Sequence, residues 1–146
     1  MEELFELRSC LGQGRYTDAI ALIGEMEDMS RDDKINNIQI FTIVLLILMI
    51  KKEAEKRSAR SWELSIRNAV RQISRVNRRG KAGGYYLKEE ELRETVREVY
   101  EEALDNAAIE AFEGRYSDSE LAEMVDEEKI RKEALQLLLE ARRKKK

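Results

Sequence analysis

The sequence predicts an all-α protein, a single-domain helical bundle of about five to six helices around a central apolar helix. The 146-residue chain contains no proline, the strongest helix breaker, and it is rich in Glu, Lys, Arg, Leu and Ala, which favour helix. No segment alternates apolar and polar residues with the period of two that is typical of a strand. A chain of this length is typical of one domain with one hydrophobic core.

Glycines and helix-capping residues divide the chain into six expected helices. These cover residues 2–11, 18–28, 30–57, 62–77, 88–113 and 117–146. The motif Gly-Arg-Tyr-Ser/Thr-Asp occurs twice, and in each copy Gly14 or Gly114 follows a helix, where glycine adopts the left-handed conformation without strain. The motif therefore marks two helix junctions. We expect N-caps, each accepting a hydrogen bond from a backbone N–H, at Thr17, Ser30 and Ser117.

The third expected helix contains a 13-residue apolar run, Ile38–Ile50. As a helix this run spans ~20 Å, less than the ~30 Å hydrocarbon core of a membrane, so we expect no membrane span. Because it is apolar on every side, we expect Ile40–Ile50 to form the centre of the bundle. The apolar stripes of the next two helices should pack around it through Trp62, Ile66, Ile73, Val96 and Val99.

The organisation expected from these helices is a core domain over residues 1–113, followed by residues 114–146. The second segment is a C-terminal helix, either an appendage or an oligomerisation element, and the stretch VDEEK, residues 125–129, is a point at which it could divide in two. The N-terminus has no basic segment followed by an apolar one, so we expect no secretory signal. A single cysteine, Cys10, fits a reducing cytoplasm, which is the expected location.

The absence of histidine excludes several chemistries, among them Ser-His-Asp and Cys-His catalysis and histidine-containing zinc sites. No cofactor motif is present, and we expect no cofactor and assign no catalytic residue. A carboxylate-based, metal-assisted hydrolase using Glu25, Asp28 and Asp32 is one alternative. These residues belong to an acidic group that also includes Glu27 and Asp33. A calcium-binding spacing is absent and the helix dipole favours acids at a helix start, so a solvated face is the favoured interpretation, with no metal site.

Five arginines lie on one face of the expected fourth helix: Arg60, Arg67, Arg71, Arg75 and Arg78. Residues 51–81 hold eleven basic and three acidic side chains, a net charge of +8. With the basic C-terminal end, this row could track a phosphate backbone, so nucleic-acid binding is the alternative function. Residues 88–113 hold ten acidic and three basic side chains, a net charge of −7, and could neutralise the row within the fold or between subunits.

We favour a charged surface over a nucleic-acid site for this row, because any surface helix has a polar face opposite its apolar stripe. The leading functional hypothesis is a non-enzymatic protein–protein interaction module, either a homo-oligomer or bound to another protein. An apolar helix that a small bundle can hardly cover alone motivates it.

The chain resembles a bacterial, largely cyanobacterial family called domain of unknown function 29. The resemblance covers residues 7–111 in three ordered blocks: LRSCLGQGRYTDAIALIGEMEDMSRDDK, RSARSWELSIRNAVRQI and VYEEALDNAAIEA. The block RSWELSIR, Arg60–Arg67, is the most specific part. Members often carry a His in the Leu-rich helix and a Pro-Ser-Leu turn after the Arg-rich one, where this chain has Ile-Leu-Met and a glycine-rich loop. The resemblance implies an α-helical fold and no assigned activity.

Overall fold

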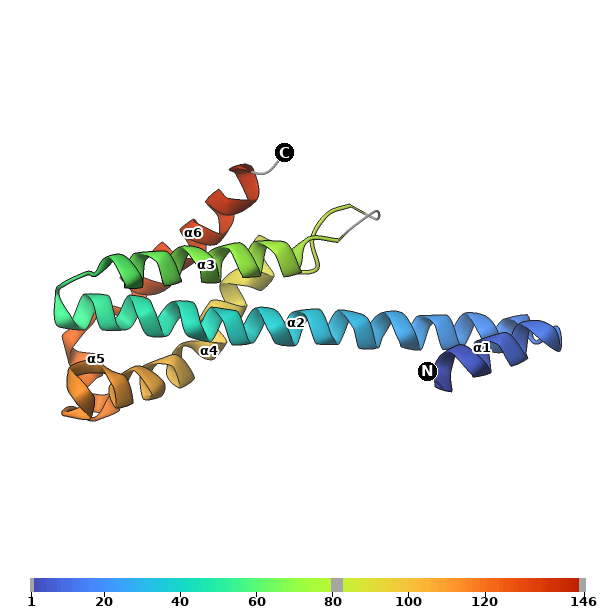
Figure 1. Ribbon diagram of the computed structural model, residues 1–146, viewed down its shortest axis with the longest axis horizontal. Coiled ribbons are helices and arrows are strands. Elements are labelled where there is room, and N and C mark those ends of the chain that lie inside the picture. The colour runs from blue at the N-terminus through green and yellow to red at the C-terminus, as the bar shows by residue number, and fades with distance from the viewer. Residues whose placement is uncertain (1, 80–82, 145–146) are drawn as a thin grey trace.

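A computed structural model of the protein describes the backbone of residues 2–79 and 83–144, and the side chains of residues 5–23, 31–79 and 83–142. These residues form helices and no strand, which confirms the predicted all-α fold (Figure 1). The helical segments are α1 (Glu2–Gly12), α2 (Tyr16–Glu55), α3 (Arg60–Asn77), α4 (Glu89–Glu110), η1 (Ala111–Gly114), α5 (Asp118–Met124) and α6 (Glu127–Lys144).

The second and third expected helices form a single helix, α2, which is 40 residues long. It begins at Tyr16, so Thr17 lies inside the helix, and Arg15 occupies the N-cap position without a side-chain hydrogen bond. Ser30 lies in the middle of α2 and starts no helix. The caps predicted at Thr17 and Ser30 were therefore wrong. A cap contributes only ~1 kcal/mol, and no Gly or Pro near Ser30 interrupts the backbone hydrogen bonds that continue the helix.

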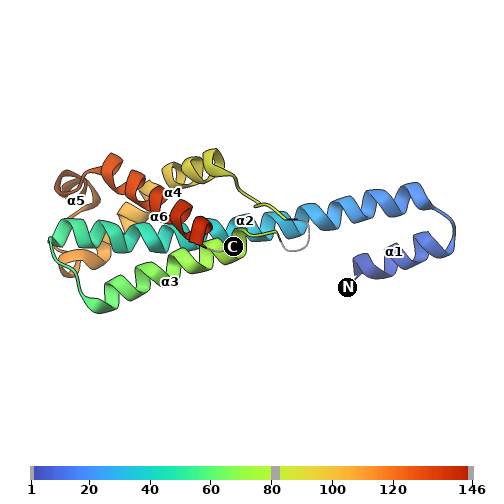
Figure 2. The same cartoon turned by 90° about the horizontal axis from the view of Figure 1, so that it is seen from above.

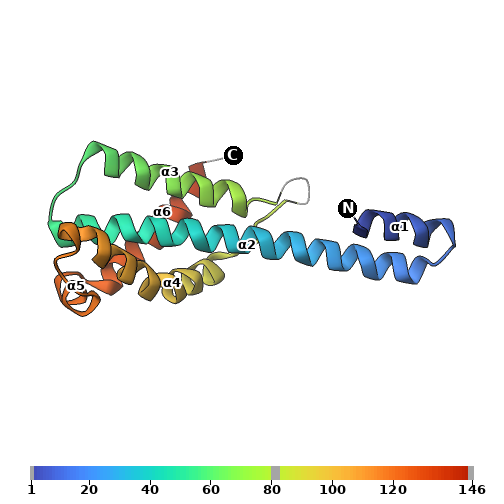
Figure 3. The same cartoon turned by 60° about the horizontal axis from the view of Figure 1, so that its bottom comes forward.

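The body of the molecule forms around the C-terminal half of α2, with α3 and α4 on different sides of it and α6 in contact with all three (Figures 1 and 3). Side chains from these helices share one core, whose α2 members are Ile38, Leu45, Leu46, Met49 and Ile50. The predicted core positions on α3 and α4 are confirmed for Ile66, Ile73, Val96 and Val99.

Two expectations about the core were wrong. Trp62 is only half-buried at the edge of α3. Ile40 and Val44, although inside the apolar run of α2, are 50% and 42% exposed. The reason is geometric, because α3, α4 and α6 leave part of the circumference of α2 uncovered. The apolar run is therefore central to the bundle on one side and open on another.

The arm, which we define as residues 2–30, extends away from the body as a hairpin of α1 and the first half of α2 (Figures 1 and 2). Gly14 in its turn has a φ of +70°, the left-handed conformation expected there. Of the described side chains of the arm, those of Cys10, Ala19 and Leu22 are buried. The arm thus has a very small core of its own.

The C-terminal part returns to the body. Gly114 has a φ of +76° and ends η1, and Ser117 caps α5. The Ser117 Oγ accepts from the backbone N–H of Glu120 at 3.2 Å, and the Glu120 carboxylate accepts from the backbone N–H of Ser117 at 3.0 Å. A break between Met124 and Glu127 separates α5 from α6. Both helices contribute to the common core, through Leu121, Ile130, Ala134, Leu135 and Leu138.

Candidate functional site

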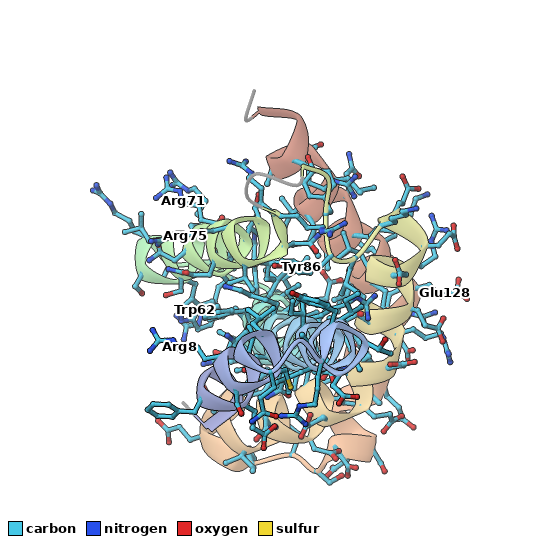
Figure 4. The ribbon with its side chains drawn as sticks, turned by 90° about the vertical axis from the view of Figure 1, so that its right-hand side faces the viewer. Arg8, Trp62, Arg71, Arg75, Tyr86 and Glu128 are labelled. Carbon is cyan, nitrogen blue, oxygen red and sulfur yellow. The ribbon has the colours of Figure 1, made fainter. Side chains whose placement is uncertain are left out.

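The Arg row, Arg60, Arg67, Arg71, Arg75 and Arg78, lies on the exposed side of α3. It lies opposite the residues that α3 buries, which include Ile66, Val70 and Ile73. Figure 4 shows Arg71 and Arg75 pointing away from the other helices, with Glu128 of α6 on the opposite side of the molecule. Among the described residues, none forms an ion pair with any arginine of the row. The row is therefore a solvated cationic surface in this chain.

The acidic helix α4 does not neutralise the Arg row within the fold. It lies on a different side of α2 from α3 (Figures 1 and 3), and its carboxylates pair with arginines of its own. Arg93 pairs with Glu89 at 3.4 Å and also with Glu90, and Arg97 pairs with Glu94, whose pKa this contact lowers. The sequence allowed the acidic helix to neutralise the Arg row within the fold or between subunits. Only neutralisation between subunits remains compatible with the structure.

Trp62, in the block RSWELSIR, holds the start of α3 against the end of α2. The Nζ atom of Lys51 lies 5.2 Å from the centroid of the indole ring, and the guanidinium of Arg57 lies 4.8 Å from it. Cations over an aromatic face are attracted by its quadrupole. This block therefore has a structural role at the junction of α2 and α3.

Glu63, the next residue of the block, completes this junction. Its carboxylate accepts hydrogen bonds from Lys52 Nζ at 2.8 Å and from Ser58 Oγ at 2.5 Å. These contacts, that of Lys52 above all, hold the pKa of Glu63 below its ordinary value. Lys56 adopts a φ of +50° where α2 ends. The junction is thus made by side chains from both helices and from the turn between them.

A groove of about 660 Å³ lies between the end of α2, the start of α3 and α6. This volume is within the range of ~300–1,000 Å³ that ligand pockets occupy. Its apolar lining comes from Met49, Ile66, Ile130 and Leu137. The charged lining is mixed, with Lys52, Lys56, Arg57, Arg67, Glu53, Glu63, Glu133 and Glu140. The sequence did not predict this groove, because its lining residues lie up to 91 positions apart along the chain and no local pattern links them.

Helix α2 leaves two apolar patches exposed. The arm patch consists of Tyr16, Ile20 and Ile23, which are 64%, 71% and 42% exposed. The body patch consists of Ile40 and Val44. Lys51 lies two turns beyond Val44 on the same face of α2. Because Lys51 contacts both Glu110 of α4, at 3.3 Å, and Trp62 of α3, the body patch faces outward between α3 and α4.

The acidic group proposed as a hydrolase site is only partly described. The side chains of Glu25, Glu27 and Asp28 lie outside the described side chains, and those of Asp32 and Asp33 are exposed. Within the part of the chain that the structure describes, no three His, Cys, Asp or Glu side chains are grouped so that they could hold a metal ion.

One segment of α2 has the length and composition of a membrane span. The most apolar window of 18 residues within residues 31–55 has a mean hydropathy of 1.6, and 33% of that window is buried within the chain. The core helix of a soluble bundle meets the same criteria. The residues of this segment that are buried are covered by α3, α4 and α6, whose outer faces are charged.

Comparison with known proteins supports one assignment. No curated protein and no solved structure matches the chain. One family model matches residues 7–125, from the arm through α5, and this range includes the block RSWELSIR. As the resemblance predicted, the chain belongs to the family described as Domain of unknown function DUF29.

Proposed function

We propose that the protein is a non-enzymatic protein–protein interaction module of the cytoplasm that associates with a second copy of itself. The observation that carries this proposal is the pair of apolar patches on α2, which the helices of the same chain leave uncovered. Contiguous exposed apolar surface on a soluble protein marks an interaction site. The mixed charge beside the groove and the opposite charges of α3 and α4 add polar surfaces that suit a protein partner.

A membrane is a poorer partner for these patches. Insertion of residues 31–55 would require Ile38, Leu45 and Ile50 to leave the core that they form with α3, α4 and α6. It would also bring Lys51, Lys52 and Glu53 to the membrane, where charged side chains are costly. We therefore expect the protein to remain in the supernatant without detergent after centrifugation at high speed.

Light scattering coupled to size exclusion tests self-association. We expect a dimer or larger species at roughly 100 µM, a hundredfold above a micromolar dissociation constant. Ile20→Glu, in the arm patch, should shift the protein toward the monomer. Leu64→Glu is the matched control, because Leu64 is 45% exposed on α3 and outside both patches. A wild-type protein that is monomeric at that concentration would overturn the proposal.

Binding of nucleic acid is a second candidate, favoured by one observation, the absence of ion pairs between the Arg row and the described acids. Each phosphate contact on duplex DNA contributes about −0.9 to the slope of log affinity against log salt. Replacing Arg67, Arg71 and Arg75 together by alanine should therefore reduce the slope by about 2.7. Lys132→Ala on α6 is the control. No binding at low salt, or an unchanged slope in the triple variant, would remove this candidate.

A further inference from the structure

We propose that α2 pairs with α2 of a second copy in an antiparallel two-fold dimer, in which the arm patch of each copy covers the body patch of the other. This inference rests on the proposed self-association and specifies its geometry. Three features carry it. They are the spacing of the exposed side chains on α2, the register that places apolar side chains opposite apolar ones, and the net charges of residues 2–34 and 51–81.

Two series of accessible side chains, spaced by seven residues or by fourteen, run along α2, and the sequence places Glu27 and Ser30 at the two positions between them. One series contains Ile20, Lys34, Phe41 and Leu48, and the other, offset by three or four positions, contains Tyr16, Ile23, Asn37 and Val44. All eight are exposed or half-buried. A heptad repeat with apolar side chains at two positions is the pattern by which helices pair as a coiled coil. The seam runs along the whole open side of α2 and crosses from the arm to the body.

The seam is apolar near both ends and polar in its middle, where the sequence has Glu27, Ser30, Lys34 and Asn37. In an antiparallel pair that is centred near residue 32, Ile20 lies opposite Val44 of the second copy, and Ile23 lies opposite its Phe41. Shifting one helix by a heptad instead places Ile20 opposite Asn37 or Lys51. One register therefore matches apolar with apolar side chains, and it places Lys34 opposite position 30 and Asn37 opposite position 27 of the second copy, which are Ser30 and Glu27 in the sequence. Polar residues in a seam fix register and orientation in this way.

Charge separates the antiparallel arrangement from a parallel one. Residues 2–34 hold nine acidic and four basic side chains, a net charge of −5, whereas residues 51–81 have a net charge of +8. Antiparallel pairing brings the acidic arm of each copy beside the basic helix α3 of the other, while α4, in the segment with a net charge of −7, flanks the opposite side of the body patch. Parallel pairing would place like charges side by side, which opposes association.

The seam is long, and its apolar contacts lie at its two ends. From Tyr16 to Leu48 it extends over ~50 Å of helix at ~1.5 Å per residue. This corresponds to ~5 heptads, whose middle positions are polar, so the two-fold axis would give two separate apolar contacts, one at each end of the seam. The pairing also explains how the arm is stabilised. Its three described buried side chains form a very small core, and contact with α2 of the second copy would bury further apolar side chains of the arm.

Disulfide cross-linking tests the pairing, since a disulfide requires Cα atoms within about 7 Å. Cys10 is the only cysteine and is buried, so Cys10→Ala supplies the background. The double variant Ile20→Cys with Val44→Cys should form most of its protein as covalent dimer under mild oxidation. Each single variant alone should form little, and a mixture of the two singles should form a covalent heterodimer. Leu64→Cys is the control for random collision of exposed thiols.

Each outcome decides a specific statement. Efficient cross-linking of the single variant Ile20→Cys would show that the arms of the two copies lie side by side, and it would overturn the antiparallel register. A dimer in light scattering that gives no cross-link in the double variant would overturn the seam and leave self-association standing. A monomer in light scattering would remove the proposed self-association itself. Helical circular dichroism of every variant is measured alongside, and Ile20→Ser with Val44→Ser shows whether the two positions tolerate small polar side chains.

Discussion

Replacing Asn77 by alanine should lower the free energy of unfolding by about 3 kcal/mol. Asn77 is the last residue of α3 and is 1% exposed. Its Nδ2 donates to the carbonyl of Leu87 at 3.0 Å, and its Oδ1 accepts from the N–H of Leu87 at 2.7 Å. The backbone carbonyl of Asn77 also accepts from the N–H of Tyr86 at 2.9 Å. One side chain therefore closes the connection between α3 and α4.

The size of this loss in the free energy of unfolding follows from the polar groups that the substitution leaves without hydrogen-bond partners. Alanine removes both side-chain hydrogen bonds and leaves the N–H and the carbonyl of Leu87 without these partners, although Leu87 is only 4% exposed. An orphaned buried polar group costs ~1–3 kcal/mol, so two cost ~2–6 kcal/mol before any water reaches them. A value near the lower end is expected, because the described residues beside this contact, Arg78, Arg79, Gly83 and Gly84, are exposed and water can reach the polar groups. It is a large part of a typical total of ~5–15 kcal/mol.

Urea unfolding measures this loss at one fixed protein concentration, because self-association adds to apparent stability. With a dependence on urea of ~2 kcal/mol per molar, the midpoint should fall by ~1.5 M. Asn106→Ala is the matched control, since Asn106 is exposed on α4 and donates only to the carbonyl of Glu102 at 2.9 Å. The control should change stability by less than ~0.5 kcal/mol. A loss for Asn77→Ala no larger than that of the control would refute the reasoning.

Three further changes test other parts of the structure. Tyr100→Phe should leave the free energy of unfolding unchanged or raise it by up to ~1 kcal/mol, because the buried hydroxyl has no hydrogen-bond partner among the described residues; a loss above ~1 kcal/mol in urea would contradict this. Ser117→Ala should cost ~1 kcal/mol through the lost cap of α5, whereas Thr17→Ala should cost less than half as much, and equal losses would show that the cap of α5 is not formed in solution. The lowered pKa of Glu63 stabilises the fold at pH values above the ordinary value of 4.5, and this contribution is lost as the pH falls through the lower folded-state value. Stability measured from pH 6 to 3 should therefore fall less in Glu63→Gln than in the wild type, and identical pH profiles would refute the contact with Lys52 and Ser58.

Local pattern determined much of this fold. The 3.6-residue period separates the buried side chains of α3, such as Ile66 and Ile73, from its Arg row, and the structure places both as the period requires. Gly14 and Gly114 adopt the left-handed conformation because only glycine enters it without strain from Cβ. The block RSWELSIR, on which the resemblance to the family depends most, lies within the residues that the family model matches.

The positions of the helix N-caps were predicted less well from the sequence than the helices themselves. Ser117 and Thr17 occupy the same place in the repeated motif, yet only Ser117 caps a helix. A serine or threonine stabilises a helix start by ~1 kcal/mol where the chain already turns, and it does not make the chain turn. Near Ser30 no Gly or Pro interrupts the backbone, so the helix continues through a residue that could have capped a new one.

The sequence by itself determined that the chain is helical and where its amphipathic faces lie, because these properties arise from neighbours within one or two helical turns. The match to the family over residues 7–125 is likewise a property of the sequence. Only the tertiary structure decided that Trp62 contacts two cations and that a groove forms among α2, α3 and α6. It also decided which apolar side chains of α2 remain exposed to solvent. An apolar residue is buried or exposed according to what packs against it, and that contact comes from helices distant in the chain.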